Sequence, residues 1–129
     1  MMVACCLMSC EVTPEQMIVG KWKVTSAVQT HNDASGTVSE DLPGFDDYHY
    51  EFDASGLCKI HQRQSVITYE WFLTEKRQLV LTNYSSDPLV YDVPDLQKRH
   101  MTLVYKFEYQ YGPDSLTYKA EHRFELEKE

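Results

Sequence analysis

The chain has 129 residues, a formal net charge of -8 and an aromatic content of 12%. This length is sufficient for one domain with a hydrophobic core. The excess of carboxylates would repel a phosphate backbone, which excludes nucleic acid as an expected partner. Cys58 is the only cysteine in the body of the chain, because Cys5, Cys6 and Cys10 lie near its start, so a disulfide framework inside the domain is excluded.

Residues 1–9 are apolar or small and carry no charge. The segment is too short to cross a bilayer, but it resembles the end of a secretory signal. Leu7, Met8, Ser9 and Cys10 resemble a lipobox, the motif at which bacterial signal peptidase cuts before a cysteine that becomes lipid-modified. We therefore expect residues 1–9 to be a signal-peptide remnant and Cys10 to carry a lipid. The protein would then be a lipoprotein of the bacterial cell envelope, anchored in the outer membrane on its periplasmic or surface face. The alternative is a cytosolic start with chance cysteines.

A tether and a short helical turn are expected over residues 10–17. The residues from Thr13 to Gln16 form a capping-box pattern with proline at the first helical position. Gly20 ends this turn, and a first strand follows. Its alternation predicts that four side chains share one face: Trp22, Val24, Ser26 and Val28.

The segment between Thr30 and Asp47 is rich in turn-forming residues and has no helical period, which predicts a long surface loop. From His31 to Asp53 the chain contains seven acidic residues and no lysine or arginine. We interpret these acidic residues as a solvent-exposed surface rather than a cation site, since their spacing matches no calcium loop. The loop 31–46 is also the candidate contact for a protein partner.

Residues 47–63 predict a β-hairpin whose register follows from its turn. Ala54, Ser55 and Gly56 would form a three-residue loop with glycine in the left-handed conformation. This register pairs aromatic with apolar residues on one face and opposite charges on the other. The predicted pairs are Phe52 with Cys58, Tyr50 with Ile60, Tyr48 with Gln62, Glu51 with Lys59, His49 with His61, and Asp47 with Arg63.

Two further hairpins are expected. In the first, Trp71 faces Leu81 and Leu73 faces Leu79, while Phe72 and Val80 form an apolar pair on the outer face. Residues 85–98 predict one short irregular strand near 89–93. In the last hairpin, inward-facing Phe107 meets Ala120, and the outer face carries two opposite-charge pairs, Lys106 with Glu121 and Glu108 with Lys119.

These elements predict an all-β fold of about eight antiparallel strands in meander order. An up-and-down barrel removes the edges that an open meander would expose, and a sandwich of two sheets is the alternative. Gly20, Lys21 and Trp22, which follow the short helical turn, resemble the lipocalin signature. Residues 50–56 and 71–81 are similar to the lipocalin-like domains of small Bacteroidetes lipoproteins. The resemblance spans residues 18–124 and implies a calycin-like barrel over residues 18–129. It also implies a late arginine that crosses the tryptophan, for which Arg123 is the candidate.

The predicted interior is unusually rich in tyrosine, whereas a sealed core would favour aliphatic side chains. We therefore predict non-enzymatic binding of a small, mainly apolar ligand inside the barrel. The predicted ligand-binding residues are Trp22, Tyr48, Tyr50, Trp71, Tyr105, Tyr118 and His122. The alternative is a barrel filled by its own aromatic residues, which would act as a protein–protein interaction or structural module of the cell envelope.

No catalytic motif supports an enzyme or a cofactor. The sequence has no nucleophile elbow, no glycine-rich phosphate loop and no paired metal ligands at helical spacing. His49 and His61 would lie close enough across two strands to share a metal ion, but without a third ligand we interpret them as surface histidines.

Overall fold

The computed structural model describes residues 12–33, 36–45, 47–111 and 116–129. Within these residues the chain forms one short helix, α2 (Pro14–Ile18), and nine strands. The strands are β1 (Gly20–Asp33), β2 (Gly36–Asp41), β3 (His49–Phe52), β4 (Leu57–His61), β5 (Val66–Leu73), β6 (Gln78–Asn83), β7 (Ser86–Leu96), β8 (His100–Tyr111) and β9 (Leu116–Lys128).

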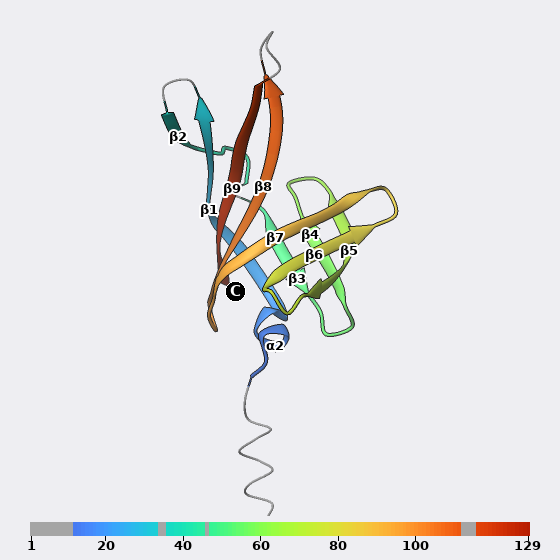
Figure 1. Ribbon diagram of the computed structural model, residues 1–129. Helices are drawn as coiled ribbons and strands as arrows, with labels where there is room; N and C mark the ends of the chain where they lie inside the picture. Colours follow the sequence, from blue (N-terminus) through green and yellow to red (C-terminus); the bar gives the residue numbers. More distant parts are fainter. Residues whose placement is uncertain (1–11, 34–35, 46, 112–115) are drawn as a thin grey trace, which may run out of the picture.

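Eight of these strands close into an antiparallel barrel, as predicted. From β3 to β9 each strand pairs with the next, and β1 closes the barrel by pairing with both β3 and β9. The ninth strand, β2, pairs with residues 28–33 of β1, beyond the point where β3 ends (Figure 1). The prediction of a continuous loop between Thr30 and Asp47 is therefore wrong. Residues 28–33 of β1 lie beyond β3, so their backbone N–H and C=O groups on that edge need other partners, and β2 supplies them.

The registers predicted for the three hairpins are confirmed. Glu51 lies opposite Lys59, Trp71 opposite Leu81, and Phe107 opposite Ala120. In the first turn Gly56 has φ +99°, and the amide of Asp53 donates to the carbonyl of Leu57 at 2.9 Å. Turn chemistry therefore set the register of this hairpin.

The register shifts in β1, β6 and β7, and these irregularities correct two of the predictions. In β1 the register shifts between Val24 and Ser26, so Ala27 is buried and Ser26 is exposed. The prediction that Ser26 and Val28 share the face of Trp22 is wrong, because a β-bulge reverses the alternation. The strand predicted near 89–93 is longer than expected, since β7 extends from Ser86 to Leu96. A register shift accompanies each of its prolines, one in the pairing with β6 beside Pro88 and one in the pairing with β8 at Pro94.

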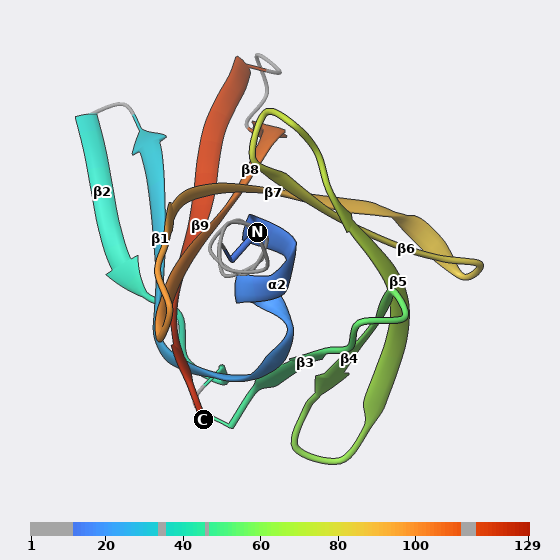
Figure 2. The same cartoon turned by 90° about the horizontal axis from the view of Figure 1, so that it is seen from below.

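The helix α2 lies across one end of the barrel (Figure 2). Its capping box is present, with Thr13 as the N-cap and Gln16 as its reciprocal partner. Ile18 is fully buried beneath the barrel, and the indole nitrogen of Trp22 donates to its carbonyl at 2.7 Å. This end of the barrel is therefore closed by the chain itself.

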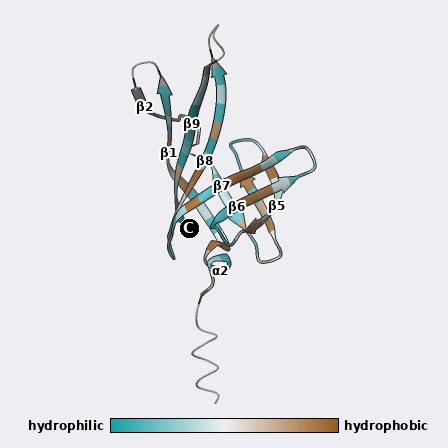
Figure 3. Ribbon diagram, viewed as in Figure 1, coloured by the Kyte–Doolittle hydropathy of each residue, from teal (hydrophilic) through white to brown (hydrophobic). Residues whose placement is uncertain are grey.

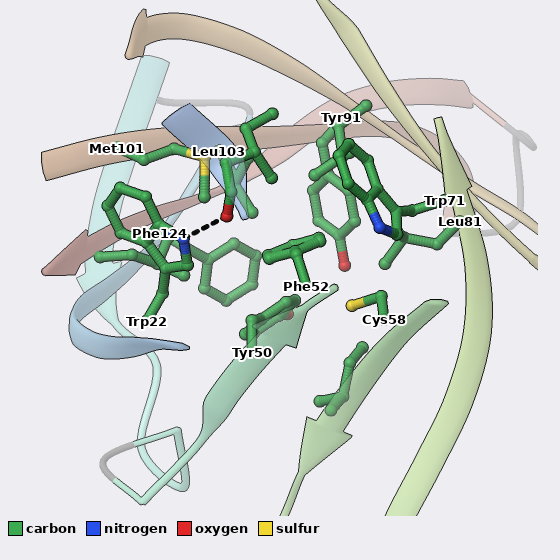
Figure 4. Packing of buried hydrophobic residues seen from close by; sticks show 14 of the residues in the cluster. Trp22, Tyr50, Phe52, Cys58, Trp71, Leu81, Tyr91, Met101, Leu103 and Phe124 are labelled. Atoms are coloured by element: carbon green, nitrogen blue, oxygen red, sulfur yellow. Dashed lines mark hydrogen bonds between the residues drawn. The ribbon is translucent and has the colours of Figure 1, made fainter. Parts of the chain in front are cut away.

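The core fills the barrel above α2 (Figure 4). Every barrel strand contributes buried side chains, and the hydrophobic stretches of β5, β6 and β7 belong to this part of the molecule (Figure 3). The fully buried large residues include Trp22, Phe52, Leu79, Leu81, Met101, Leu103 and Leu126. Burial of such a side chain stabilises the fold by about 1.5–3 kcal/mol.

One part of the sheet continues beyond the barrel, and we call it the extension. It consists of residues 28–33 of β1, β2, residues 105–111 of β8 and residues 116–122 of β9 (Figure 1). In the described pairings β7 pairs with β8 only as far as Val104, whereas β9 pairs with β8 up to Tyr111. The extension is thus a four-stranded sheet that rises from one side of the barrel, at the end away from α2.

Candidate ligand-binding site

The seven residues predicted to bind a ligand are divided between two places. Three lie in the packed core, with little of their surface exposed: Trp22 (0%), Tyr50 (3%) and Trp71 (9%). The other four are half-buried and lie near the open end of the barrel or in the extension: Tyr48, Tyr105, Tyr118 and His122.

The polar groups of the core residues are engaged by the protein itself. The indole nitrogen of Trp71 donates to the carbonyl of Asp53 at 3.1 Å, as that of Trp22 does to Ile18. Tyr50 hydrogen-bonds Tyr91, and burial raises the pKa of Tyr50 well above its ordinary value and that of Tyr91 to about 12. A ligand inside the barrel would have to displace these internal hydrogen bonds.

Cys58 also belongs to this core and is fully buried. Burial raises the pKa of its thiol to about 12. The thiolate is the reactive form of cysteine, so Cys58 is chemically inert and contributes only to packing.

The segment between β2 and β3 brings aromatic rings to the end of the barrel opposite α2. The ring centroid of Phe45 lies 4.7 Å from that of Tyr48 and 5.1 Å from that of Phe124. The amide of Leu42 donates to the carbonyl of Ala27 at 2.9 Å, which attaches this segment to β1. Phe45 and Tyr48 therefore pack over the core where the extension begins.

A row of aromatic side chains continues from this point along the extension. We call it the aromatic face, and it consists of Tyr105, Phe107, Tyr109, Tyr118 and His122. Tyr105 and Phe107 are stacked with centroids 5.8 Å apart, and Tyr109 and Tyr118 are stacked at 5.7 Å. The centroids of Phe107 and Tyr109 are 6.3 Å apart, so the two stacks are continuous.

The aromatic face has the same orientation as the barrel interior. Leu103 and Phe124 are buried opposite one another, and the next inward positions on β8 and β9 are Tyr105 and His122. All five rings of the aromatic face are half-buried. They are covered less than the core residues because, among the described strands, none closes over the extension from the opposite side (Figure 1).

His122 is held in place at the base of the aromatic face. Its Nε2 lies 3.0 Å from Oε1 of Gln29, and its ring packs edge-on against Phe107 with centroids 5.0 Å apart. Burial lowers its pKa below the ordinary histidine value. On the same face of β1, Nδ1 of His31 is buried and has no hydrogen-bond partner among the described residues.

The opposite face of the extension is polar. Lys106 lies opposite Glu121 and Glu108 opposite Lys119, as predicted. Together with Thr30 and Asn32 these residues line an open depression of about 500 Å³, which the neighbouring inner-face positions His31, Phe107 and Ala120 also border. The two faces of one sheet therefore differ in chemistry, and the aromatic rings belong only to the inner one.

The two histidines considered as metal ligands each contact a carboxylate instead. They lie opposite one another, as the register predicted. Nε2 of His61 is 3.0 Å from Oε1 of Glu51, and Nδ1 of His49 is 3.1 Å from Oε2 of Glu129. Within the described part of the chain, no group of three or more histidine, cysteine or acidic side chains is arranged to hold a metal ion.

The cation that lies over Trp22 is Lys128 rather than Arg123. The Nζ of Lys128 is 5.1 Å from the centroid of the Trp22 ring and donates to the carbonyl of Met17 at 2.9 Å. Arg123 is exposed and lies opposite Val104 and Val28. The role implied for Arg123 is therefore wrong, because Arg123 lies on the outer face of β9. Lys128 lies at the end of β9, where the strand meets α2, and can therefore reach Trp22.

The outer apolar pair predicted on the second hairpin is present and extends to a third strand. Phe72 lies opposite Val80, which lies opposite Val90. Phe72 is 53% exposed and Val90 is 39% exposed. Scattered apolar residues are ordinary on protein surfaces, and we assign no function to these three.

The fold defines the class of protein as a closed, up-and-down antiparallel β-barrel with one end covered by a short helix. No protein-family model matches the chain, and no curated protein matches its sequence. In the described residues, no helix has both the length and the apolar character needed to span a bilayer.

Sequence reasoning left three aromatic residues out of the predicted site: Phe45, Phe107 and Tyr109. The register had placed Phe107 on the inward face, and the same alternation could have added it to the set. Phe45 lies in a segment without periodicity, so no sequence signal indicated that its ring would pack on Phe124. The predicted lipid-bearing Cys10 lies outside the described residues, as do Ala34, Ser35 and Asp46 of the segment predicted to contact a partner.

Proposed function

We propose that the protein binds a small, mainly apolar ligand without catalysis, and that the ligand lies on the aromatic face. The observation that carries this proposal is the continuous row of stacked, half-buried rings on one side of the extension. Stacking on such rings is worth about 0.5–1.5 kcal/mol per aromatic pair beyond the buried area. A flat apolar molecule would therefore gain contacts from several rings at once.

The aromatic face supports binding better than the barrel interior does. Trp22, Tyr50 and Trp71 are buried by neighbouring side chains and bonded to other protein groups. The rings of the extension retain exposed surface, and His122 and Gln29 supply polar groups at their base. Ligand sites generally combine apolar walls with a few polar groups in this way.

A fluorescence titration with the apolar dye Nile red tests the proposal. We expect the dye to bind the native protein and the Phe107→Ala variant to bind it about three- to tenfold more weakly, as the loss of one ring contact predicts. Phe72→Ala is the matched control, because Phe72 is an exposed aromatic residue on the outside of the barrel. Equal affinities for the native protein and Phe107→Ala, or no binding at all, would contradict the proposal.

We further propose that the protein is a lipoprotein of the bacterial cell envelope, tethered through a lipid on Cys10. The support is the lipobox-like sequence that ends at Cys10, four residues before the start of α2. A tether at this position would leave the extension, at the other end of the barrel, directed away from the membrane (Figure 1). Mass spectrometry of the N-terminal peptide of the protein from its own cells would show a diacylglyceryl group on Cys10. An unmodified peptide that still contains residues 1–9 would refute the tether.

A further inference from the structure

The inner face of the extension contains almost no formal charge. Across its four strands the register aligns Tyr105, His122, Gln29 and Glu40 in one row and Phe107, Ala120, His31 and Val38 in the next. Among these residues, and with Tyr109 and Tyr118 included, Glu40 is the only acidic side chain and there is no lysine or arginine. The one fixed charge described on the face is therefore negative.

The basic residues in and next to the extension on β8 and β9 lie on the other face. Lys106, Lys119 and Arg123 occupy the alternate positions, where Lys106 and Lys119 face acidic residues of the neighbouring strand. Nζ of Lys106 also lies 3.5 Å from a carboxylate oxygen of Asp92. These cations therefore lie on the face away from the aromatic rings and do not balance Glu40 on the inner face.

The aromatic rings add to this preference for positive charge. The face of a tyrosine or phenylalanine ring carries partial negative charge and attracts a cation that lies within about 6 Å of its centroid. Tyr105, Phe107, Tyr109 and Tyr118 form a continuous row of such rings. Glu40 lies two strand spacings from His122, about 10 Å away. The net charge of -8 acts in the same direction at longer range.

We propose that the ligand of the aromatic face is an organic cation with a flat apolar body, which stacks on the rings while its charged group lies toward Glu40. This inference rests on the proposed function and adds the chemical class of the ligand. His122 does not oppose it at neutral pH, because burial lowers its pKa and keeps the imidazole uncharged.

Three naphthalene probes of similar shape test the charge preference. The 2-trimethylammonium derivative is a cation, 2-tert-butylnaphthalene is its neutral isostere, and 2-naphthoate is an anion. Their ability to displace Nile red from the full chain at low salt gives the relative affinities. We expect the cation to bind about tenfold more tightly than the neutral isostere and the anion most weakly. The advantage of the cation should shrink as salt is added.

A charge-removing variant locates the effect. Glu40→Gln should reduce the preference for the cation about threefold and leave binding of the neutral isostere unchanged. Glu108→Gln, on the opposite face of the extension, is the matched control and should change neither. The inference is overturned if the neutral isostere binds as tightly as the cation, or if both variants behave alike. If the inference is overturned but the neutral isostere binds more weakly to Phe107→Ala than to the native protein, the proposed function is still supported. If no probe binds, the proposed function fails as well.

Discussion

The barrel and the extension are built from the same strands but differ in what covers their inner face. In the barrel, residues such as Trp22 and Leu103 are enclosed by strands from the opposite wall and are fully buried. In the extension, Tyr105 and Phe107 continue the alternation of β8 but remain half-buried. An inward-facing aromatic residue therefore becomes part of the core only where the sheet closes around it. Elsewhere the same alternation produces an accessible surface.

The largest expected effect comes from emptying a site in the barrel. Trp22→Ala should lower the free energy of unfolding by about 3–5 kcal/mol, because it removes a fully buried ring and leaves a cavity. Tyr109→Ala, in the extension, should lower it by less than about 1 kcal/mol because its ring is only half-buried. Urea unfolding of both variants measures the difference. Similar losses would show that the extension is as much a part of the core as the barrel is.

A smaller effect is expected at the closed end of the barrel. Gly20 has φ +136°, and a Cβ atom there would lie 2.7 Å from Cε of Lys128. Gly20→Ala would strain the backbone and displace Lys128 from Met17 and Trp22, with a loss of about 1–3 kcal/mol. Thermal unfolding would detect this loss. In a Lys128→Ala background the same substitution should be less harmful, since only the backbone strain remains. An equal loss in both backgrounds would show that Lys128 adapts without penalty.

The smallest effect concerns the titration of His122 in the extension. Because burial lowers its pKa in the folded state, the unfolded chain takes up a proton at higher pH than the folded protein. The contribution of His122 to stability is therefore complete above the unfolded pKa and decreases as the pH falls below it. An NMR titration of the imidazole should give a midpoint below the ordinary histidine value. His122→Gln should remove this part of the pH dependence, and an ordinary midpoint would mean that the aromatic face is fully solvated.

Much of the fold followed from local sequence patterns. The turn at Ala54, Ser55 and Gly56 determined the pairing of Glu51 with Lys59, because a turn of fixed length leaves one register. The capping box at Thr13 likewise predicted the start of α2. By contrast, the bulge near Thr25 and the strand β2 carried no recognisable local signal. Both depend on how β1 meets its neighbours in the closed sheet.

The candidate site was predictable only in part, for the same reason. Alternation correctly placed Tyr105, Tyr118 and His122 on the inner face of the last hairpin. It could not show that these residues lie beyond the barrel while Trp22 and Trp71 lie within it. That distinction depends on where β7 separates from β8, which is beyond the pairing of Asp92 with Val104.

Local sequence patterns were sufficient for the hairpin registers and for the strands and apolar faces outside β2 and the bulged half of β1, since these depend on residues a few positions apart. Only the tertiary structure decided where the barrel closes, that Lys128 rather than Arg123 lies over Trp22, and that Phe45 packs on Phe124. These contacts join residues far apart in the chain, and their geometry depends on the closure of the whole sheet rather than on any local pattern.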